Sequence, residues 1–517
     1  MNEVLEKNNE LVYEVINRCI DCMEIEEICV YGDMPEEITS VYEYTSKKYI
    51  QSIYECVGFP LTFIRIDRES QLDEIESIIQ NNRYKQDFII YLKDYKLFKA
   101  LSEYLNTGSE NDESVFLTRG KILLAGKTFD KPKKNNVPDD FKVLAIIHFY
   151  NEVDVIGRTI EYLIAQRADI YLVDNWSDDG SYEIAAEKQK KYPDRIFLEH
   201  FPESGRTENY EWYNQLERTE EIAKEYSYNW YIHYDADEIR ICPWKGCDLR
   251  MMLYKVEQLG YNLVENTVID HKIVSYDEEN IFLKDTYFDF GHKTSNFMQT
   301  KTWKRNEKFD LKKSGGHIVK IEEPKIYPLK ILNRHYPLRS VRQAQKKIYI
   351  DREPRFSKEK KERGWHAHYD KFIKGQSFIN SKENLILWDD KTFDKYYIQL
   401  FTGCGVKIEN DGTEYLLDIK EITGKKIIIY GAGKIGKSVY KKIEKVADIV
   451  AWVDNNCKQY GMIYGRRILG VIKATELDFD YIIVAVKDKN SQVQIVNTLI
   501  NFGIIEKKIK CVHFYND

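Results

Sequence analysis

The stretch KVLAIIHFYNEVDVIGRTIEYLIAQRADIYLVDNWSDDGS, residues 142–181, decides the fold class of the chain. Residues 142–147 form an apolar run typical of a buried strand, and the apolar side chains of Ile156 and Ile160 then recur at helical spacing. A second apolar run at 170–173 ends in a polar loop. This succession of strand, helix and strand predicts a parallel sheet. Both polar loops are expected at the edge where open α/β sheets bind ligands.

A third apolar and aromatic run, residues 229–234, leads into the acidic sequence Asp235-Ala236-Asp237-Glu238. Strand alternation would direct the carboxylates of Asp235 and Asp237 to the same side. Two like charges are costly to bury without a counter-ion, so a bound divalent cation is expected between them. Oxygen ligands favour Mg²⁺ or Mn²⁺. A solvated acidic turn after the strand is the alternative interpretation of this motif.

The composition narrows the function classes. Of 517 residues, 77 are Lys or Arg and 84 are Asp or Glu, and the resulting net charge of −7 argues against a dedicated nucleic-acid-binding protein. No apolar run is long enough for a transmembrane helix, and the first residues lack the pattern of a signal peptide. The nine cysteines are scattered, and Cys19 and Cys22 have no second pair to complete a zinc site. We therefore expect a cytoplasmic protein with reduced thiols.

The length of the chain predicts about three domains, since roughly 100–200 residues per domain is typical. Short apolar runs alternate with helix-length patterns near both ends, and a polar linker at 131–138 follows the first such region. The predicted segments are a Rossmann-like α/β module at 1–135, a central α/β domain at 140–345, a helical connector at 346–420 and a second Rossmann-like module at 421–517. Within the connector, the charged run 357–363 is expected to form a solvated helix face.

The C-terminal module carries a glycine-rich turn. A predicted strand runs directly into GAGKIG, residues 431–436, and the next strand ends at Asp454. Glycines at this spacing allow close approach of a phosphate, and the acid suits ribose hydroxyls, so the pattern is a dinucleotide-binding fingerprint. Gly431, Gly433, Gly436 and Asp454 are thus candidates for a second nucleotide site, with NAD as its ligand. Because no acid or base for hydride transfer is evident nearby, a structural or regulatory role is favoured over redox chemistry.

The motifs of the central domain resemble those of a known family. Three segments resemble the nucleotide-sugar-binding half of GT-A glycosyltransferases. They are an Asn-Glu loop after the first strand, a Val-Asp-Asn-x-Ser-x-Asp-Gly segment at the second strand and the Asp-Ala-Asp-Glu sequence after a later strand. The chain is most similar to family 2 and to a related bacterial branch with a His-Tyr-Pro-x-Arg-Ser segment, here HYPLRS at 335–340. The resemblance covers about residues 142–345. It implies a central GT-A domain, a Rossmann-like nucleotide-diphospho-sugar transferase fold, flanked by two smaller α/β modules.

This resemblance implies roles for particular residues. It implies that the donor nucleotide is bound by Asn151, Glu152, Asp174, Asp178 and Arg339. It also implies that the metal ion is bound by Asp235, Asp237 and His335. Asp174 would contact the base or ribose, His335 would complete the metal site, and Arg339 would neutralise phosphate charge. A nucleoside diphosphate leaves with growing negative charge, which a metal ion and a guanidinium stabilise.

The acceptor half offers several candidates for the catalytic base that an inverting reaction requires. His317 follows two glycines that would let the backbone approach a sugar ring. The further candidates, in order, are Asp289, Asp285, Glu322 and Glu323. The acceptor half lacks the clear Glu-Asp pair of the common family 2 pattern, so the base and the choice between inversion and retention stay open. The pair His366 and His368 is interpreted as exposed loop histidines.

The predicted function is that of a metal-dependent glycosyltransferase of the hexosyltransferase type, using Mn²⁺ or Mg²⁺ and a nucleotide-sugar, with a UDP-sugar favoured. The acceptor would be a glycan or a protein, in surface polysaccharide synthesis or flagellar glycosylation. One alternative is an NAD(H)-dependent sugar-modifying oxidoreductase or epimerase that acts through the C-terminal module. Another is a non-catalytic scaffold that binds sugar nucleotides. The two flanking modules offer surfaces for homo-oligomer formation.

Overall fold

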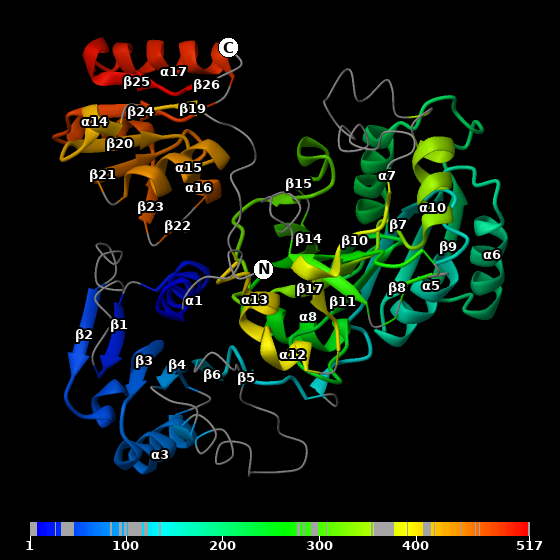
Figure 1. Ribbon diagram of the computed structural model, residues 1–517, viewed down its shortest axis with the longest axis horizontal. Helices are drawn as coiled ribbons and strands as arrows, with labels where there is room; N and C mark the ends of the chain where they lie inside the picture. The colour runs from blue at the N-terminus through cyan, green and yellow to red at the C-terminus, as the bar shows by residue number, and fades with distance from the viewer. Residues whose placement is uncertain are drawn as a thin grey trace. The chain divides into compact units, whose positions relative to one another are not determined.

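Strands and helices alternate along the chain in the computed structural model (Figure 1). The structure describes residues 8–25, 27–32, 46–82, 85–92, 96–97, 101, 116–117, 122–133, 136–276, 280–282, 284, 286–290, 298–306, 308–352, 355, 377–389, 391–406, 415–417, 419–444, 446–460, 462–464, 466–486 and 488–514. Two compact units are formed, one by Met1–Val15, Cys29–Asp33 and Tyr49–Ile408, the other by Ile16–Ile28, Met34–Lys48 and Glu409–Asp517. No described helix has the length and apolar character to cross a membrane.

The N-terminal region contains a six-stranded sheet. Its elements include α1 (Asn8–Met23), β1 (Glu27–Tyr31), β2 (Ser46–Ile50), β3 (Leu61–Ile66), α3 (Leu72–Asn82), β4 (Asp87–Leu92), β5 (Phe116–Leu117) and β6 (Ile122–Gly126). The strand order is β2-β1-β3-β4-β6-β5. Strands β1, β3 and β4 are parallel, as the alternating pattern predicts, whereas β6 is antiparallel to β4. Ile75 and Ile79 of α3 share a core with Phe88 of the sheet.

The central domain is built on a ten-stranded sheet. Its strands are β7 (Val143–Phe149), β8 (Asp169–Asp174), β9 (Ile196–His200), β10 (Trp230–Asp235), β11 (Glu238–Ile241), β12 (Leu263–Lys272), β13 (Tyr287–Phe290), β14 (Met298–Lys304), β17 (Ile331–His335) and β18 (Ile386–Leu387). The main order is β11-β17-β12-β14-β10-β7-β8-β9, and β13 joins β12 to β18. Strands β10, β7, β8 and β9 are parallel, as predicted for β7 and β8, and β14 is antiparallel to both of its neighbours.

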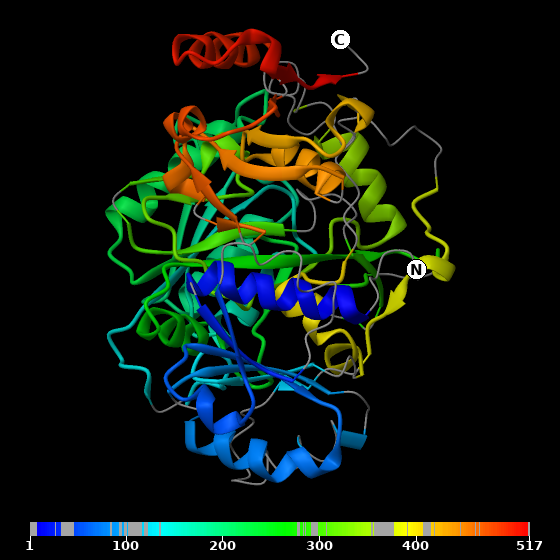
Figure 2. The ribbon, with the colours of Figure 1, turned by 90° about the vertical axis from the view of Figure 1, so that its left-hand side faces the viewer.

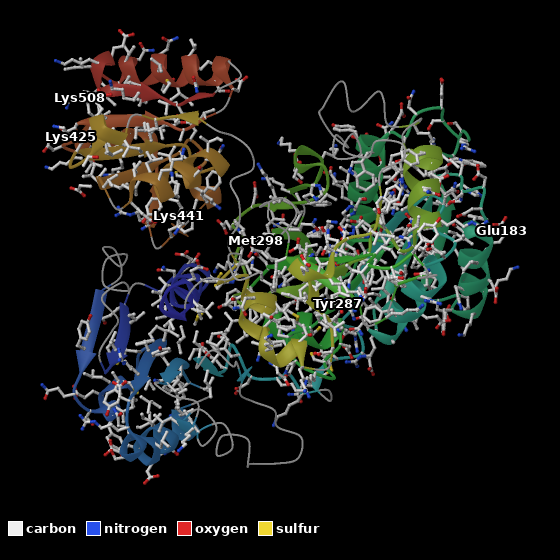
Figure 3. All side chains as sticks on the ribbon, viewed as in Figure 1. Glu183, Tyr287, Met298, Lys425, Lys441 and Lys508 are labelled. Atoms are coloured by element: carbon white, nitrogen blue, oxygen red, sulfur yellow. The ribbon has the colours of Figure 1, made fainter. Side chains whose placement is uncertain are left out.

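The helices of the central domain bury apolar faces against this sheet. They are α5 (Ile156–Ala165), α6 (Ser181–Lys191), α7 (Trp212–Glu225) and α8 (Leu249–Gln258). Helix α5 buries Ile156, Ile160 and Leu163, which confirms the predicted periodicity. Glu183 on α6 points into solvent (Figure 3). Leu216 of α7 belongs to the same core as the apolar side chains of β7.

The described part of the segment that follows β17 contains helices and a short strand. It begins with α10 (Val341–Lys346) and continues directly into the π-helix η5 (Lys347–Arg352). The short helices α12 (Thr392–Lys395) and α13 (Tyr397–Thr402) come later, after β18 has paired with β13. The predicted connector therefore contributes a strand to the central sheet. The predicted charged helix at 357–363 and the pair His366 and His368 lie outside the described residues.

The C-terminal module has a six-stranded sheet of its own. Its strands are β20 (Lys426–Tyr430), β21 (Asp448–Val453), β22 (Met462–Ile463), β23 (Arg466–Leu469), β24 (Tyr481–Val484) and β25 (Ile509–Cys511), in the order β22-β23-β21-β20-β24-β25. All but β22 run parallel. Helices α15 (Lys434–Ile443) and α17 (Lys489–Asn501) cover opposite faces (Figures 1 and 2). Val439 of α15 packs with Ile427 and Ile429, whereas Leu499 of α17 packs with Ile428.

Candidate active site

The loops after three parallel strands meet at one edge of the central sheet, as the sequence predicts for the first two. In the register of β7 and β8, Phe149 is the partner of Asp174, and in that of β10 and β7, Asp235 is the partner of His148. The carboxyl ends of the three strands therefore align. The loop that carries Glu152 lies beside the loops that follow Asp174 and Asp235, at the edge where open α/β sheets bind ligands.

Asp235 ends β10 and is paired with a lysine that the sequence analysis did not identify. Lys301 of β14 places its Nζ 2.6 Å from Asp235 Oδ2 and 3.3 Å from Glu238 Oε1. Burial alone would raise the pKa of Asp235, but the charge of Lys301 outweighs it and the pKa falls to about 2. Asp235 thus has a counter-ion within the protein and stays ionised at neutral pH.

Asp237 lies in the turn between β10 and β11, and cations surround its carboxylate. Its Oδ2 lies 2.8 Å from Lys347 Nζ and 3.5 Å from Arg339 Nη1. The prediction of a metal ion between Asp235 and Asp237 rests on the premise that neither has a counter-ion, and that premise is wrong. Within the described part of the chain, no three His, Cys, Asp or Glu side chains form a group that could hold a metal ion.

His335 at the end of β17 is held by a second acid on the neighbouring strand. Its Nδ1 lies 2.8 Å from Oδ1 of Asp270, its register partner on β12, and its Nε2 lies 3.8 Å from Asp237 Oδ1. Burial would lower the pKa of His335, but the hydrogen bond to Asp270 and the charges of both acids raise it to about 9. Because Asp270 fixes one ring nitrogen, the other is directed toward Asp237.

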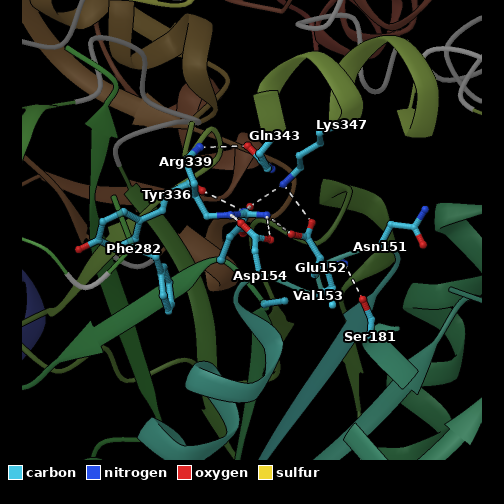
Figure 4. A network of polar contacts seen from close by, with 12 residues as sticks. Asn151, Glu152, Val153, Asp154, Ser181, Phe282, Tyr336, Arg339, Gln343 and Lys347 are labelled. Carbon is cyan, nitrogen blue, oxygen red and sulfur yellow. Dashed lines mark hydrogen bonds and ion pairs between the residues drawn. The ribbon is translucent and has the colours of Figure 1, made fainter. Parts of the chain in front are cut away.

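Arg339 is enclosed by acids and has no exposed side-chain surface (Figure 4). It donates through Nε and Nη2 to both oxygens of Asp154, at 2.8 and 2.9 Å, and through Nη2 to Glu152 Oε2 at 2.5 Å. Nη1 contacts Asp237 and the carbonyl oxygen of Tyr336. Burial would lower the pKa of Arg339, but the charges of these acids raise it. The predicted phosphate-binding arginine therefore neutralises protein carboxylates in this structure.

Glu152 accepts hydrogen bonds from cations of the segment after β17. Lys347 Nζ lies 3.0 Å from its Oε1, and Arg352 Nη2 lies 3.2 Å from the same atom. Sequence reasoning missed both cations. They stand five residues apart, at the two ends of η5, and i,i+5 spacing is the hydrogen-bonding period of a π-helix. The basic residues that follow Arg339 are the signal that could have identified them.

Asn151 connects the first two loops to the π-helix. Its Nδ2 donates to Asp178 Oδ1 and to Asp351 Oδ1, both at 2.9 Å, and its Oδ1 accepts from the Asp178 backbone N–H at 3.0 Å. Asn151 has a φ of 55°, a left-handed conformation that asparagine tolerates better than most residues. Asp178 also pairs with Arg206, whose Nη1 lies 2.7 Å from Oδ2. The structure thus brings Asn151 and Asp178 together, as their predicted shared role requires.

Asp174 is fully buried and supports its own loop. It accepts from the Ser177 hydroxyl at 2.5 Å, from the Ser177 backbone N–H at 3.1 Å and from His200 Nδ1 at 2.9 Å. The His200 ring stacks between Trp176 and Tyr182, with centroid distances of 4.3 and 3.9 Å. The carboxylate predicted to contact the base or ribose therefore has protein partners for both of its oxygens.

The predicted catalytic bases lie on different elements. His317 is exposed, with Nδ1 3.3 Å from Gln299 Nε2 of β14. Gly316 has a φ of 89°, and a Cβ there would lie 3.0 Å from Leu216 Cδ2 and 3.2 Å from His233 Nε2, so backbone conformation and packing within the protein already favour glycine at this position. Asp289 on β13 is the register partner of Asp270, which places both on the same face. Of the remaining candidates, Glu322 and Glu323 are exposed, and Asp285 is outside the described residues.

In the C-terminal module, the carboxylate of Asp454 accepts hydrogen bonds from the backbone of the glycine-rich turn and of its own loop. Asp454 accepts from the backbone N–H of Ala432 at 2.7 Å and from that of Asn456 at 2.7 Å. A Cβ on Gly436 would lie 1.7 Å from the Gly431 carbonyl oxygen. The third glycine therefore serves the close packing of α15 on the turn. The acid predicted to bind ribose hydroxyls is bonded to backbone.

Comparisons with known proteins identify two regions of the chain. The family model described as Glycosyl transferase family 2 matches residues 144–211, and the one described as C2185-like, N-terminal matches residues 423–510. No curated protein matches the chain. Among solved structures, a mannosyltransferase from Pyrobaculum calidifontis in complex with GDP-Man and Mn²⁺ is 17% identical over 27% of this chain and 39% of that chain, with a TM-score of 0.19. Mannosyl-3-phosphoglycerate synthase from Rubrobacter xylanophilus is 13% identical over 48% of this chain and 86% of that chain, with a TM-score of 0.21.

The family 2 match runs from β7 to the residue before α7 and includes Asn151, Glu152, Asp174 and Asp178. Together with the parallel strands β9, β8, β7 and β10, it supports the predicted fold class, a GT-A central domain flanked by two smaller α/β modules. The family that matches these residues is one of glycosyl transferases. The chain spans less than half of the first solved structure's length.

Proposed function

We propose that the central domain is a metal-dependent glycosyltransferase of the hexosyltransferase type. It moves a sugar from a nucleotide donor to a glycan or protein acceptor. The observation that carries this proposal is the position of Asp237. Its carboxylate lies 3.8 Å from His335 Nε2 and 2.8 Å from Lys347 Nζ, and Lys347 also binds Glu152 in the region of the family 2 match.

Asp237 Oδ1 and His335 Nε2 are the two ligands that this edge offers a divalent cation, and His335 must give up its proton when the cation binds. Asp237 Oδ1 faces His335 Nε2, and Asp270 holds the opposite ring nitrogen, an arrangement that metal-ligating histidines commonly use. We assign these two residues as ligands, with Asp235 beside them. Mn²⁺ or Mg²⁺ bound there would act as a Lewis acid toward the departing diphosphate. The ion pairs of Asp237 with Lys347 and Arg339 keep its carboxylate charged and ready to bind.

The remaining residues have positioning and proton-transfer roles in this proposal. The hydrogen bond between Asn151 and Asp178 holds the loops after β7 and β8 together, and Asp174 fixes the loop after β8 by accepting from Ser177. Glu152 orients Lys347 and Arg352, and Arg339 keeps Glu152 and Asp237 in place. His317 or Asp289 accepts the proton of the acceptor hydroxyl as the glycosidic bond forms. A UDP-sugar is the first donor to test, followed by GDP- and CDP-sugars.

The variant Asp237→Asn tests the function most simply. Asparagine keeps the shape of the side chain but loses the charge that binds a cation, so transfer from the nucleotide-sugar should fall by at least about a hundredfold. Because Lys347 and Arg339 lose a buried partner, the melting temperature should fall as well, and transfer is compared at a temperature where circular dichroism shows both proteins folded. Asp194→Asn, an exposed acid in the turn before β9, is the matched control and should retain full activity. Full transfer by Asp237→Asn would reject the proposal.

The alternatives make different demands on the C-terminal module. An NAD(H)-dependent reaction requires Asp454 to accept from ribose hydroxyls in addition to the backbone N–H groups of Ala432 and Asn456. A non-catalytic scaffold requires nucleotide binding at Asp237 without transfer to any acceptor. We therefore assign the C-terminal module a structural or regulatory role and the chemistry to the central domain.

A further inference from the structure

Arg355 is a buried cation at the edge of the candidate donor site. Arg355 is only 6% exposed, and its guanidinium carbon lies 4.3 Å from the centre of the Tyr150 ring. Nη2 donates to Asn175 Oδ1 at 2.9 Å and to the Thr207 carbonyl oxygen at 3.2 Å. Tyr150 follows β7 and Asn175 follows β8, so Arg355 lies between the first two loops of the site.

The hydrogen bonding of Arg355 is incomplete. Among the described residues, neither its Nε nor its Nη1 has an acceptor, although both atoms are buried. Its hydrogen-bond acceptors are neutral oxygens, whereas Lys347 and Arg352 each contact the Glu152 carboxylate. A buried guanidinium with unpartnered N–H groups is costly, and an anion that accepts from them would remove that cost.

The surroundings of Arg355 suit a phosphate. A second guanidinium, that of Arg206, lies 5.5 Å from the Tyr150 ring and donates to the Tyr150 hydroxyl at 2.7 Å. Stacking on the tyrosine and the hydrogen bond to Asn175 hold the planar guanidinium of Arg355 in one orientation. Its free N–H groups can then bind phosphate oxygens without a large loss of side-chain entropy.

We infer that Arg355 is a donor-binding residue whose Nε and Nη1 groups donate hydrogen bonds to a phosphate oxygen of the bound nucleoside diphosphate. This inference rests on the proposed function, because it takes the edge formed by β7 and β8 as the donor site. It adds a residue from outside the family 2 match, on the segment that follows η5.

The test compares binding of nucleoside diphosphates with binding of the matching nucleosides to the full-length chain. UDP, GDP, CDP and ADP and their nucleosides are titrated by calorimetry or by competition in the presence of Mn²⁺. Arg355→Gln should weaken the diphosphate that binds wild type by about 10- to 100-fold, the usual value of a charge-assisted hydrogen bond, and leave the nucleoside unchanged. Arg355→Lys keeps the charge and should restore part of the affinity.

The matched control is Arg195→Gln. Arg195 pairs with Asp169 at the amino end of the strands, away from the loops, and its Nε lies 2.9 Å from Asp169 Oδ1. This variant should bind the diphosphate as wild type does. If Arg355→Gln fails to fold, the comparison rests on Arg355→Lys, which should then weaken the diphosphate and spare the nucleoside.

Two outcomes would overturn the inference while leaving the proposed function intact. In the first, wild type and the Arg355 variants bind the diphosphate equally well. In the second, the variants lose nucleoside and diphosphate affinity to the same extent, which would assign Arg355 to the base. If wild type binds none of the four diphosphates, the proposed function fails together with the inference.

Discussion

At the residue scale, Arg339 joins three acids that are distant from it in the sequence. Glu152 and Asp154 come from the loop after β7, and Asp237 comes from the turn after β10. Their charges are close enough to repel one another strongly if the guanidinium is removed. In this structure Arg339 therefore acts as an internal counter-ion, and its contribution to stability should be measurable apart from any contribution to catalysis.

The variant Arg339→Leu should lower the free energy of unfolding by about 3–5 kcal/mol, because it leaves buried carboxylates without one of their partners. Urea denaturation followed by circular dichroism measures this quantity. Arg206→Leu is the control, since its ion pair with Asp178 is about half exposed and should contribute less than about 1 kcal/mol. Equal, small losses for both variants would show that Arg339 is not required for the stability of the site.

The sequence identifies one partner in several of these contacts but seldom both. Asp235, Asp237, His335 and Arg339 are all predicted at the site, because their residue types and motifs match a known pattern. Lys301 is not predicted, since it reaches Asp235 only through the antiparallel pairing of β14 with β10. Such a pairing joins segments far apart in the chain and leaves no local periodicity to detect.

At the scale of elements, the turn between β20 and α15 shows that a sequence motif can form its predicted structure while its residues contact the protein itself. The strand, the glycines and the helix all form where the pattern predicts them. Close packing requires Gly431 and Gly436, and Asp454 accepts from the backbone N–H of Ala432. The π-helix η5 is the opposite case. Its local sequence is compatible with an ordinary α-helix, so nothing in it predicts the spacing that brings both Lys347 and Arg352 to Glu152.

Two alanine variants separate the packing role of the turn from ligand binding. In Gly436→Ala the new Cβ would lie 1.7 Å from the Gly431 carbonyl oxygen, so the module should lose about 3 kcal/mol of stability. In Gly433→Ala the closest atom outside the turn, Tyr460 Oη, lies 3.9 Å away, and the stability should change by less than about 1 kcal/mol. Thermal unfolding measures both. A large effect of Gly433→Ala, or none of Gly436→Ala, would contradict the packing account.

At the scale of the whole molecule, alternating apolar runs predict the α/β class correctly, whereas the division into domains stays a prediction. The order of the central sheet is less accessible, because β11, β12, β14 and β17 pair through contacts between distant segments. Since β17 lies between β11 and β12, it brings His335 to Asp270 and Asp237. The candidate metal site is thus a product of sheet topology, and the motif after β10 supplies only part of it.

The most direct test of the central claim is thermal unfolding of the full-length chain with UDP, GDP, CDP, ADP and NAD(H), each in the presence of Mn²⁺ or of EDTA. A ligand at a hundred times its dissociation constant adds about 2.7 kcal/mol of stability, which shifts the melting temperature measurably. We expect stabilisation by a nucleoside diphosphate that is lost with EDTA and in Asp237→Asn. Stabilisation by NAD(H) alone, unaffected by EDTA, would contradict the account and move the nucleotide site to the C-terminal module.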